Sequence, residues 1–111
     1  MERRESRRHD VKLPGVILAA NGEVFATITV RNIGVGGLLF DSALPFQLHD
    51  QLTIRLEMEG EQYLAEAVVK HCGQVLANDE PYSSGVEFTK PDGALISCIA
   101  RLESADRETW S

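Results

Sequence analysis

The sequence predicts a mainly β fold, a six-stranded antiparallel β-barrel with a C-terminal α-helix. Three observations support this class. Apolar and polar residues alternate through most of the chain before Pro91, which is the period of strands with one buried face. Turn residues separate these runs at short, regular intervals, as in small barrels. After Pro91 the apolar period changes to that of a helix.

Six segments carry the strand pattern, and turn residues bound each of them. The first two meet at Asn21-Gly22, a strong hairpin signal. Glycines interrupt the pattern before the third segment, and Pro45 marks the loop that follows it. A short turn near Gly60 makes the fourth and fifth segments plausible hairpin partners. The expected strands cover residues 11–20, 23–33, 38–40, 52–59, 62–76 and 85–90.

The last segment predicts an amphipathic helix that covers an open end or an edge of the barrel, where it also hides unpaired strand groups. Pro91 and Asp92 provide suitable chemistry for the helix start. We therefore expect a flexible arginine-rich arm at residues 1–10, the barrel and helix at 11–104, and a frayed tail at 105–111. The residues with i, i+3, i+4, i+7 spacing are Leu95, Cys98, Ile99 and Leu102.

Length and composition indicate one ordinary globular domain. The chain has 111 residues, of which 43% are hydrophobic and 25% are charged. No apolar run approaches the ~20 residues of a membrane span, and the arginine-rich start lacks the apolar core of a signal peptide. We therefore expect a cytoplasmic protein without membrane insertion. Cys72 and Cys98 lie in apolar segments, so we expect both to be buried free thiols.

Charge is distributed unevenly along the chain. The whole sequence has 11 Lys and Arg against 17 Asp and Glu, a net charge of −6, which argues against a DNA or RNA partner. Residues 2–12 nevertheless carry five basic and three acidic side chains. A terminal arginine run is often only a solvated tail. Its functional interpretation is that guanidinium groups bind phosphate or guanine O6 and N7 in a bidentate manner and stack on aromatic rings.

The stretch "RNIGVGG" is the second feature that does not look like scaffold. The Asn32 amide can donate and accept hydrogen bonds, which suits recognition of a nucleobase edge. Gly34, Gly36 and Gly37 allow positive φ angles and close approach of a ligand to the main chain. The alternative is a β-bulge or a tight turn at a barrel corner, where the glycines serve geometry alone.

Together the two features resemble the PilZ domain family. Its R-x-x-x-R motif precedes the first barrel strand, and Arg4 and Arg8 match it best. Its D/N-x-S-x-x-G motif ends a later strand, and Asn32 and Gly37 occupy the first and last positions. The "GVEF" stretch and the helix after it are similar to the close of such a domain, so the resemblance covers roughly residues 2–103.

The resemblance implies binding of the bacterial second messenger cyclic di-GMP and relay of the signal to an unidentified downstream protein. Arg4 and Arg8 would hold the phosphates and contact the guanines, and Asn32 with its turn would read a guanine edge. Arg3, directly before the motif, is similar to members that hold a stacked pair of ligand molecules. The number of ligand molecules per chain, the pathway and the oligomeric state stay open.

One position departs from the family motif, because Gly34 stands where the family has serine. A lost hydrogen bond to a charged partner is worth about 1.5–3 kcal/mol, or roughly ten- to a hundredfold in affinity. The alternative function is therefore a PilZ-like protein-interaction adaptor with weak or no cyclic di-GMP binding. A barrel for single-stranded nucleic acid ranks lower, because stacking aromatics are few, 6% of the chain.

The sequence gives little support for catalysis, so we expect a non-enzyme without cofactor or metal. His9, His49 and His71 are scattered and lack metal-ligand spacing. Neither a nucleophile elbow nor a phosphate-binding loop motif occurs. The glutamates at positions 57, 59, 61 and 66 alternate outward, which predicts a solvated face.

Overall fold

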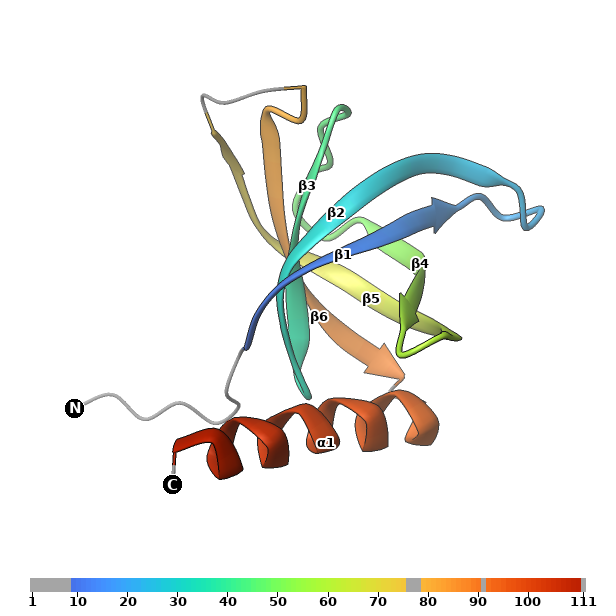
Figure 1. Cartoon of the computed structure of the whole chain (residues 1–111). Coiled ribbons are helices and arrows are strands. Elements are labelled where there is room, and N and C mark those ends of the chain that lie inside the picture. The colour runs from blue at the N-terminus through green and yellow to red at the C-terminus, as the bar shows by residue number, and fades with distance from the viewer. Residues whose placement is uncertain (1–8, 76–78, 91, 111) are drawn as a thin grey trace.

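The computed structural model describes the backbone of residues 9–75, 79–90 and 92–110, and side chains as far as Leu102. In this part of the chain, six strands form one closed antiparallel barrel, followed by a helix (Figure 1), so the predicted fold class is confirmed. The elements are β1 (His9–Leu18), β2 (Val24–Gly34), β3 (Gly37–Ser42), β4 (Gln51–Met58), β5 (Glu61–Gln74), β6 (Tyr82–Lys90) and α1 (Gly93–Trp110).

The strand order around the barrel is β1-β2-β3-β6-β5-β4. Four of the six pairings join strands that follow each other in the chain, and the β1–β4 and β3–β6 pairings close the cylinder. The β1–β4 pairing joins Gly15–Leu18 of β1 to Thr53–Leu56 of β4 and covers the facing edges of these strands over that stretch. Each strand turns one face inward, as the alternation of apolar residues predicted.

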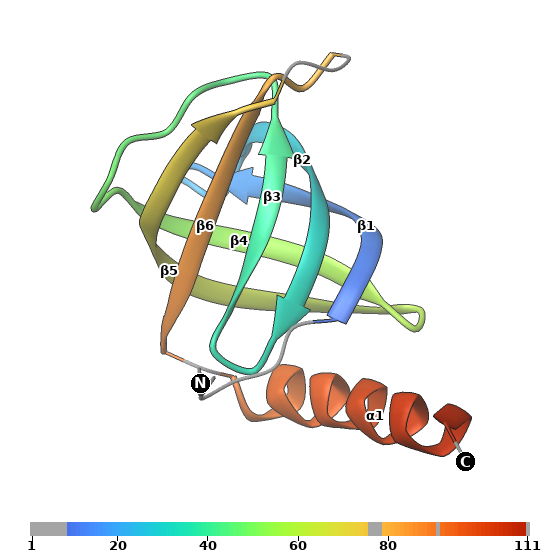
Figure 2. The same cartoon turned by 90° about the vertical axis from the view of Figure 1, so that its left-hand side faces the viewer.

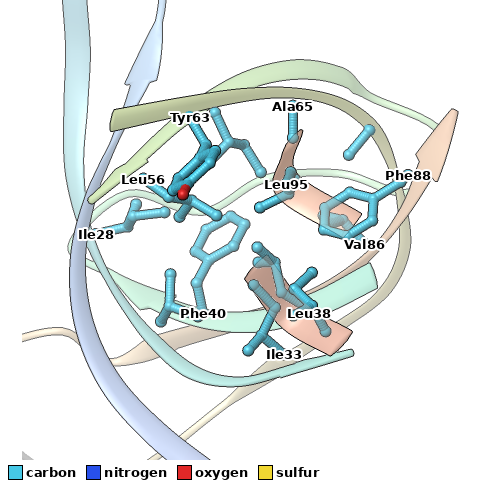
Figure 3. Packing of buried hydrophobic residues seen from close by; sticks show 14 of the residues in the cluster. Ile28, Ile33, Leu38, Phe40, Leu56, Tyr63, Ala65, Val86, Phe88 and Leu95 are labelled. Atoms are coloured by element: carbon cyan, nitrogen blue, oxygen red, sulfur yellow. The ribbon is translucent and has the colours of Figure 1, made fainter. Parts of the chain in front are cut away.

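The inward side chains form one continuous core. Phe40, which is fully buried, lies near the middle of the barrel, with Leu38 and Ile33 beside it (Figure 3). Leu95 of α1 reaches the same core, so the helix contributes to it directly. The helix and the barrel therefore share one hydrophobic core.

Helix α1 lies across one end of the barrel (Figure 2), which we call the helix end. Leu95, Cys98 and Ile99 are fully buried and Leu102 packs against the core, so the predicted apolar face is confirmed. The opposite end, the distal end, comprises residues 18–29, 42–53, 72–75 and 79–82. It is crossed by the connection between β3 and β4 rather than by a helix (Figure 2).

The helix is also fixed to the barrel by polar contacts. Arg101 Nη2 lies 3.2 Å from Glu59 Oε1, and Cys98 Sγ lies 3.8 Å from the same oxygen. The sequence had predicted only a solvated face for Glu59, whereas the structure shows that its carboxylate also contacts α1. The helical backbone continues to Trp110 and so includes residues 105–110, which the sequence had assigned to a frayed tail.

Two sequence predictions are corrected by the structure. Strand β6 begins at Tyr82, three residues earlier than predicted, because the serines that read as a loop pair with β3 and Ser84 points into the core. Cys72 is exposed, whereas Cys98 is buried as expected, and both are free thiols. Cys72 lies past the β-bulge that shifts the register of β5 between Val69 and His71, where the strand leaves the core.

Candidate functional site

The start of β1 lies beside the end of β2, at the helix end of the barrel. His9 pairs with Ile33, and Asp10 pairs with Asn32. His9 and Asp10 are the last two residues of the predicted arm, and they form the first pairs of the barrel. Arg8 is bonded to His9, so covalent connectivity attaches the arginine run next to the Asn32 turn.

The four arginines themselves lie outside the described residues. The contacts predicted for Arg3, Arg4 and Arg8 therefore stay predictions. A fully extended chain advances about 3.3–3.6 Å per residue. The five residue steps from His9 back to Arg4 therefore set an upper limit of roughly 18 Å on the distance between their Cα atoms. This limit is compatible with a ligand that contacts both motif arginines and the turn.

A β-bulge precedes the turn and orients its side chains. Val30 pairs with Phe40 and Asn32 pairs with Leu39, which leaves Arg31 as the extra residue of β2. Because Ile33 is fully buried, its neighbour Asn32 faces the outer surface, where it is half-buried. The bulge alternative raised from the sequence is therefore present, and it lies directly beside the candidate recognition residue.

Arg31 is a functional candidate that sequence reasoning missed. Its Nη1 lies 2.8 Å from Oδ2 of Asp41, whose side chain is only 8% exposed, while the Arg31 side chain is 52% exposed. A carboxylate this well buried fixes the guanidinium in one place. The guanidinium thus presents a positioned positive charge one residue from Asn32. The signal that could have found it was its place at the start of the "RNIGVGG" stretch.

The turn between β2 and β3 is tight and closely packed. Gly34 pairs with Gly37, so Val35 and Gly36 form the turn itself. The Phe88 amide donates to the Gly36 carbonyl at 2.9 Å, which ties the turn to β6. A Cβ atom on Gly37 would collide with the carbonyl oxygen of Val86, so this position requires glycine for packing.

The glycines of this turn do not adopt the positive φ angles that glycine allows. Among the described glycines, positive φ angles occur at Gly22 and Gly60, in the β1–β2 and β4–β5 connections. Glycine at position 37 is thus required because β3 and β6 approach each other closely there. The role of Gly37 in ligand binding stays a prediction. Gly34, where the family motif has serine, is buried at the end of β2.

A continuous row of outward positions extends from the arm across the outer surface. Asp10 pairs with Asn32, Asn32 with Leu39, Leu39 with Gly85, and Gly85 with His71. The exposed His71 ring lies over Gly85, within 3.3 Å of where a Cβ of residue 85 would lie. Register between distant strands creates this row, so sequence patterns alone did not indicate that half-buried Leu39 and the buried Gly85 under His71 lie on it.

Within the described ranges, no group of three or more His, Cys, Asp or Glu side chains could hold a metal ion. Likewise, none of the helices seen there combines the length and apolar character needed to cross a lipid bilayer. His49 has a positive φ of 75° and, with His71, occupies the surface.

Comparison with known proteins gives a family match over almost the whole chain. A family model described as the PilZ domain matches residues 2–104. A search of curated proteins gave no match.

Several solved structures share the fold. The PilZ domain of YcgR from Escherichia coli, solved with c-di-GMP, is 13% identical, with 97% of this chain and 95% of that chain covered and a TM-score of 0.74. The PilZ domain of CeSA from a cellulose-synthesizing bacterium is 18% identical, with 86% and 93% covered and a TM-score of 0.60.

The Bacillus subtilis inhibitor of motility, MotI/DgrA, is a longer relative in structure. It is 23% identical, with a TM-score of 0.73 and 95% of this chain covered. This chain spans only 53% of the MotI chain, about half its length. At these identities the structural matches establish the shared fold.

Proposed function

The chain belongs to the PilZ domain family, and from this premise we propose that it is a non-enzymatic receptor for cyclic di-GMP that relays the signal to a partner protein. The observation that supports the proposal best is the pairing of Asp10 with Asn32, because it attaches the arginine run beside the turn that carries the second family motif. The YcgR domain with the same fold was solved with c-di-GMP.

In this proposal the ligand lies between the arm and the outer barrel surface. Arg4 and Arg8 hold the two phosphates through charge-assisted hydrogen bonds and stack on the guanines. The Asn32 amide pairs with a guanine edge. Arg31, which neighbours Asn32 in the chain and is held through Nη1 by Asp41, offers its remaining guanidinium N–H groups as donors to the ligand.

The relay step follows from the same arrangement. Four arginines close together repel each other, and a dianion that neutralises them favours a closed arm. A ligand shifts such an equilibrium only by its preference for one form. The partner protein would then recognise the surface formed by the closed arm. The number of ligand molecules per chain tests the role of Arg3, since saturation at one ligand removes the stacked-pair hypothesis.

A second candidate function is supported by Gly34. Glycine has no hydroxyl to donate to a ligand, and Gly34 is buried where β2 ends. Loss of that bond predicts an affinity about ten- to a hundredfold lower than that of a member with serine. If main-chain N–H groups or water do not replace it, the protein is an adaptor that binds its partner without cyclic di-GMP.

Calorimetry with cyclic di-GMP, alongside amide shifts of ¹⁵N-labelled protein, tests the proposal. Arg4→Ala and Arg8→Ala should each remove most binding and leave the barrel folded. Lys12→Ala is the matched control, because it removes an exposed positive charge just outside the motif and should keep most of the affinity. Cyclic di-AMP controls for guanine recognition. Absence of binding at high micromolar ligand would support the adaptor instead.

A further inference from the structure

An apolar groove at the distal end has no role in the ligand site described above. Its lining residues are Ile17, Phe25, Leu44, Pro45, Phe46, Asp50, Gln51 and Leu52, and its volume is about 410 Å³. It therefore lies between the β1–β2 hairpin and the connection from β3 to β4. The turn at Asn32–Gly37 is at the other end of the barrel.

The groove exposes large apolar side chains that the core does not need. Phe25 is 57% exposed and Leu44 is 41% exposed, and Val24 and Leu48 nearby in the chain are also more than half exposed. Phe46 forms the inner wall, with edge-to-face ring contacts to Phe25 at 6.4 Å and to the buried Phe40 at 5.6 Å. Clustered exposed apolar residues of this kind mark interaction sites more often than scattered single ones.

The groove is built on a fixed loop. The amide of His49 donates to the Val69 carbonyl at 2.9 Å, and the Val69 amide donates to the Asp50 carbonyl at 2.9 Å. Within the loop, the Gln47 amide donates to Oδ2 of Asp50 at 2.9 Å. The loop is therefore tied to β5, and a partner would meet a surface that is already formed, which reduces the entropic cost of binding.

Charge identifies the kind of partner that fits. Asp50 lines the groove, and Glu23 directly precedes Val24 and Phe25 in the chain. None of the described residues that line the groove is Lys or Arg. An anionic lipid surface or a nucleic acid would be repelled there. A second copy docked through the same surface would bring like charges together.

From these observations we propose that the distal groove binds a basic amphipathic segment of another protein, with apolar side chains on Phe25 and Leu44 and lysines or arginines toward Asp50 and Glu23. A helix with apolar residues at i, i+3, i+4 and i+7 fits an apolar groove in this way. The groove is open at the surface, whereas small-molecule sites enclose most of their ligand. This groove is a second partner surface that goes beyond the proposed function, because the arginine arm is attached at the opposite, helix end of the barrel.

The test uses synthetic peptides and the full ¹⁵N-labelled chain. The probe is a peptide of leucine and lysine with leucines at helical spacing. One control peptide replaces lysine with glutamate, and the other replaces leucine with serine at unchanged charge. We expect the probe to shift amides at residues 24–25 and 43–52 while residues 32–37 stay unshifted, and we expect neither control to do so.

Variants of matched exposure show whether the apolar contact matters. Phe25→Ala should weaken the probe at least about tenfold, which corresponds to ~1.4 kcal/mol. Leu64 on β5 is 53% exposed, close to the 57% of Phe25, but lies outside the groove. Leu64→Ala should therefore leave the affinity unchanged. Leu44→Ala provides a second groove variant should Phe25→Ala fail to fold.

Three outcomes would overturn the inference. These are equal binding of the serine control peptide, equal binding of the glutamate control peptide, and groove shifts that depend on protein concentration alone, which would indicate self-association. Calorimetry with cyclic di-GMP on the same samples separates this inference from the ligand proposal. Peptide binding without cyclic di-GMP binding supports the groove as a docking site and rejects the receptor function. Cyclic di-GMP binding without peptide binding supports the receptor function and rejects the docking site.

Discussion

The two ends of the barrel are closed in different ways, and this difference separates two kinds of surface. At the helix end, α1 inserts Leu95, Cys98 and Ile99 into the core, and apolar surface there is covered. At the distal end a loop closes the barrel with Phe46, and Phe25 stays more than half exposed. A covered end leaves polar and main-chain groups to meet a charged ligand, whereas an uncovered end leaves apolar surface for a protein.

Charge follows the same division. The arginine run joins the barrel where His9 pairs with Ile33, and Arg31 with its buried partner Asp41 lies close to that point. The distal end has acidic residues and no Lys or Arg. A chain with a net charge of −6 can therefore attract an anion at one end and a cation at the other.

The largest expected effect is the difference in stability loss between a buried leucine at the helix end and an exposed leucine at the distal end. Leu95→Ala should destabilise the protein by about 2–5 kcal/mol, because it opens a cavity where helix and barrel share the core. Leu48→Ala, at an exposed position of the distal loop, should change stability by no more than about 0.5 kcal/mol. Urea unfolding measures both. Equal losses would mean that the helix does not close the core.

Glycine substitutions give the second contrast. Gly37→Ala should cost about 1–3 kcal/mol or more, because the added methyl group collides with the Val86 carbonyl oxygen. Gly73→Ala, near the distal end with no atom within 4 Å of its added methyl group, should be neutral or stabilising by up to about 1 kcal/mol. If Gly37→Ala were tolerated, the separation between the β2–β3 turn and β6 would have to be larger than the contact between Gly37 and Val86 requires.

Ion pairs give a smaller contrast. Arg31→Gln removes the cation that faces the buried Asp41 carboxylate, and we expect a cost of about 1–2 kcal/mol given that Arg31 itself is half-exposed. Lys70→Gln breaks the exposed pair with Glu87, which is 3.6 Å long, and should cost less than about 0.5 kcal/mol. Thermal or urea unfolding compares them, and equal costs would contradict the role of Asp41 in fixing Arg31.

The smallest effect concerns pH at the helix end. Hydrogen bonding to Cys98, and to a lesser extent burial, raises the pKa of Tyr63 above its ordinary value of 10.0. The folded protein thus holds the phenol proton more tightly than the unfolded chain. The resulting stability is fully present below pH 10 and is lost as the pH rises through the raised pKa. Tyr63→Phe should therefore lose less stability than the parent protein above pH 10. Identical alkaline slopes in urea unfolding would contradict this.

Local patterns predicted the strands and the helix because both depend on neighbouring residues. The alternation from Leu52 to Met58 and the helical spacing from Leu95 to Leu102 each indicate one buried face without knowledge of the rest. The barrel class followed from turn signals and from the family resemblance, whereas the strand order around the barrel is known from the structure.

Features that depend on strand register were not predictable in this way. The collision that fixes Gly37 involves Val86, far along the chain, and the outer row that joins Asn32 to His71 needs three strand pairings. The exposure of Cys72 follows from the register shift in β5, and the distal groove around Phe25 combines side chains of β1, β2, β4 and the β3–β4 connection. Only the assembled fold brings these residues together.

A titration of ¹⁵N-labelled protein with cyclic di-GMP that follows both ends of the barrel at once decides whether the ligand binds beside the Asn32 turn. We expect amide shifts at the arm, at Asn32–Gly37 and around Leu39, with distal residues 43–52 unshifted, and loss of these shifts in Arg8→Ala. Shifts centred on the distal groove, or unchanged shifts in Arg8→Ala, would rule out a ligand site between the arm and the Asn32 turn.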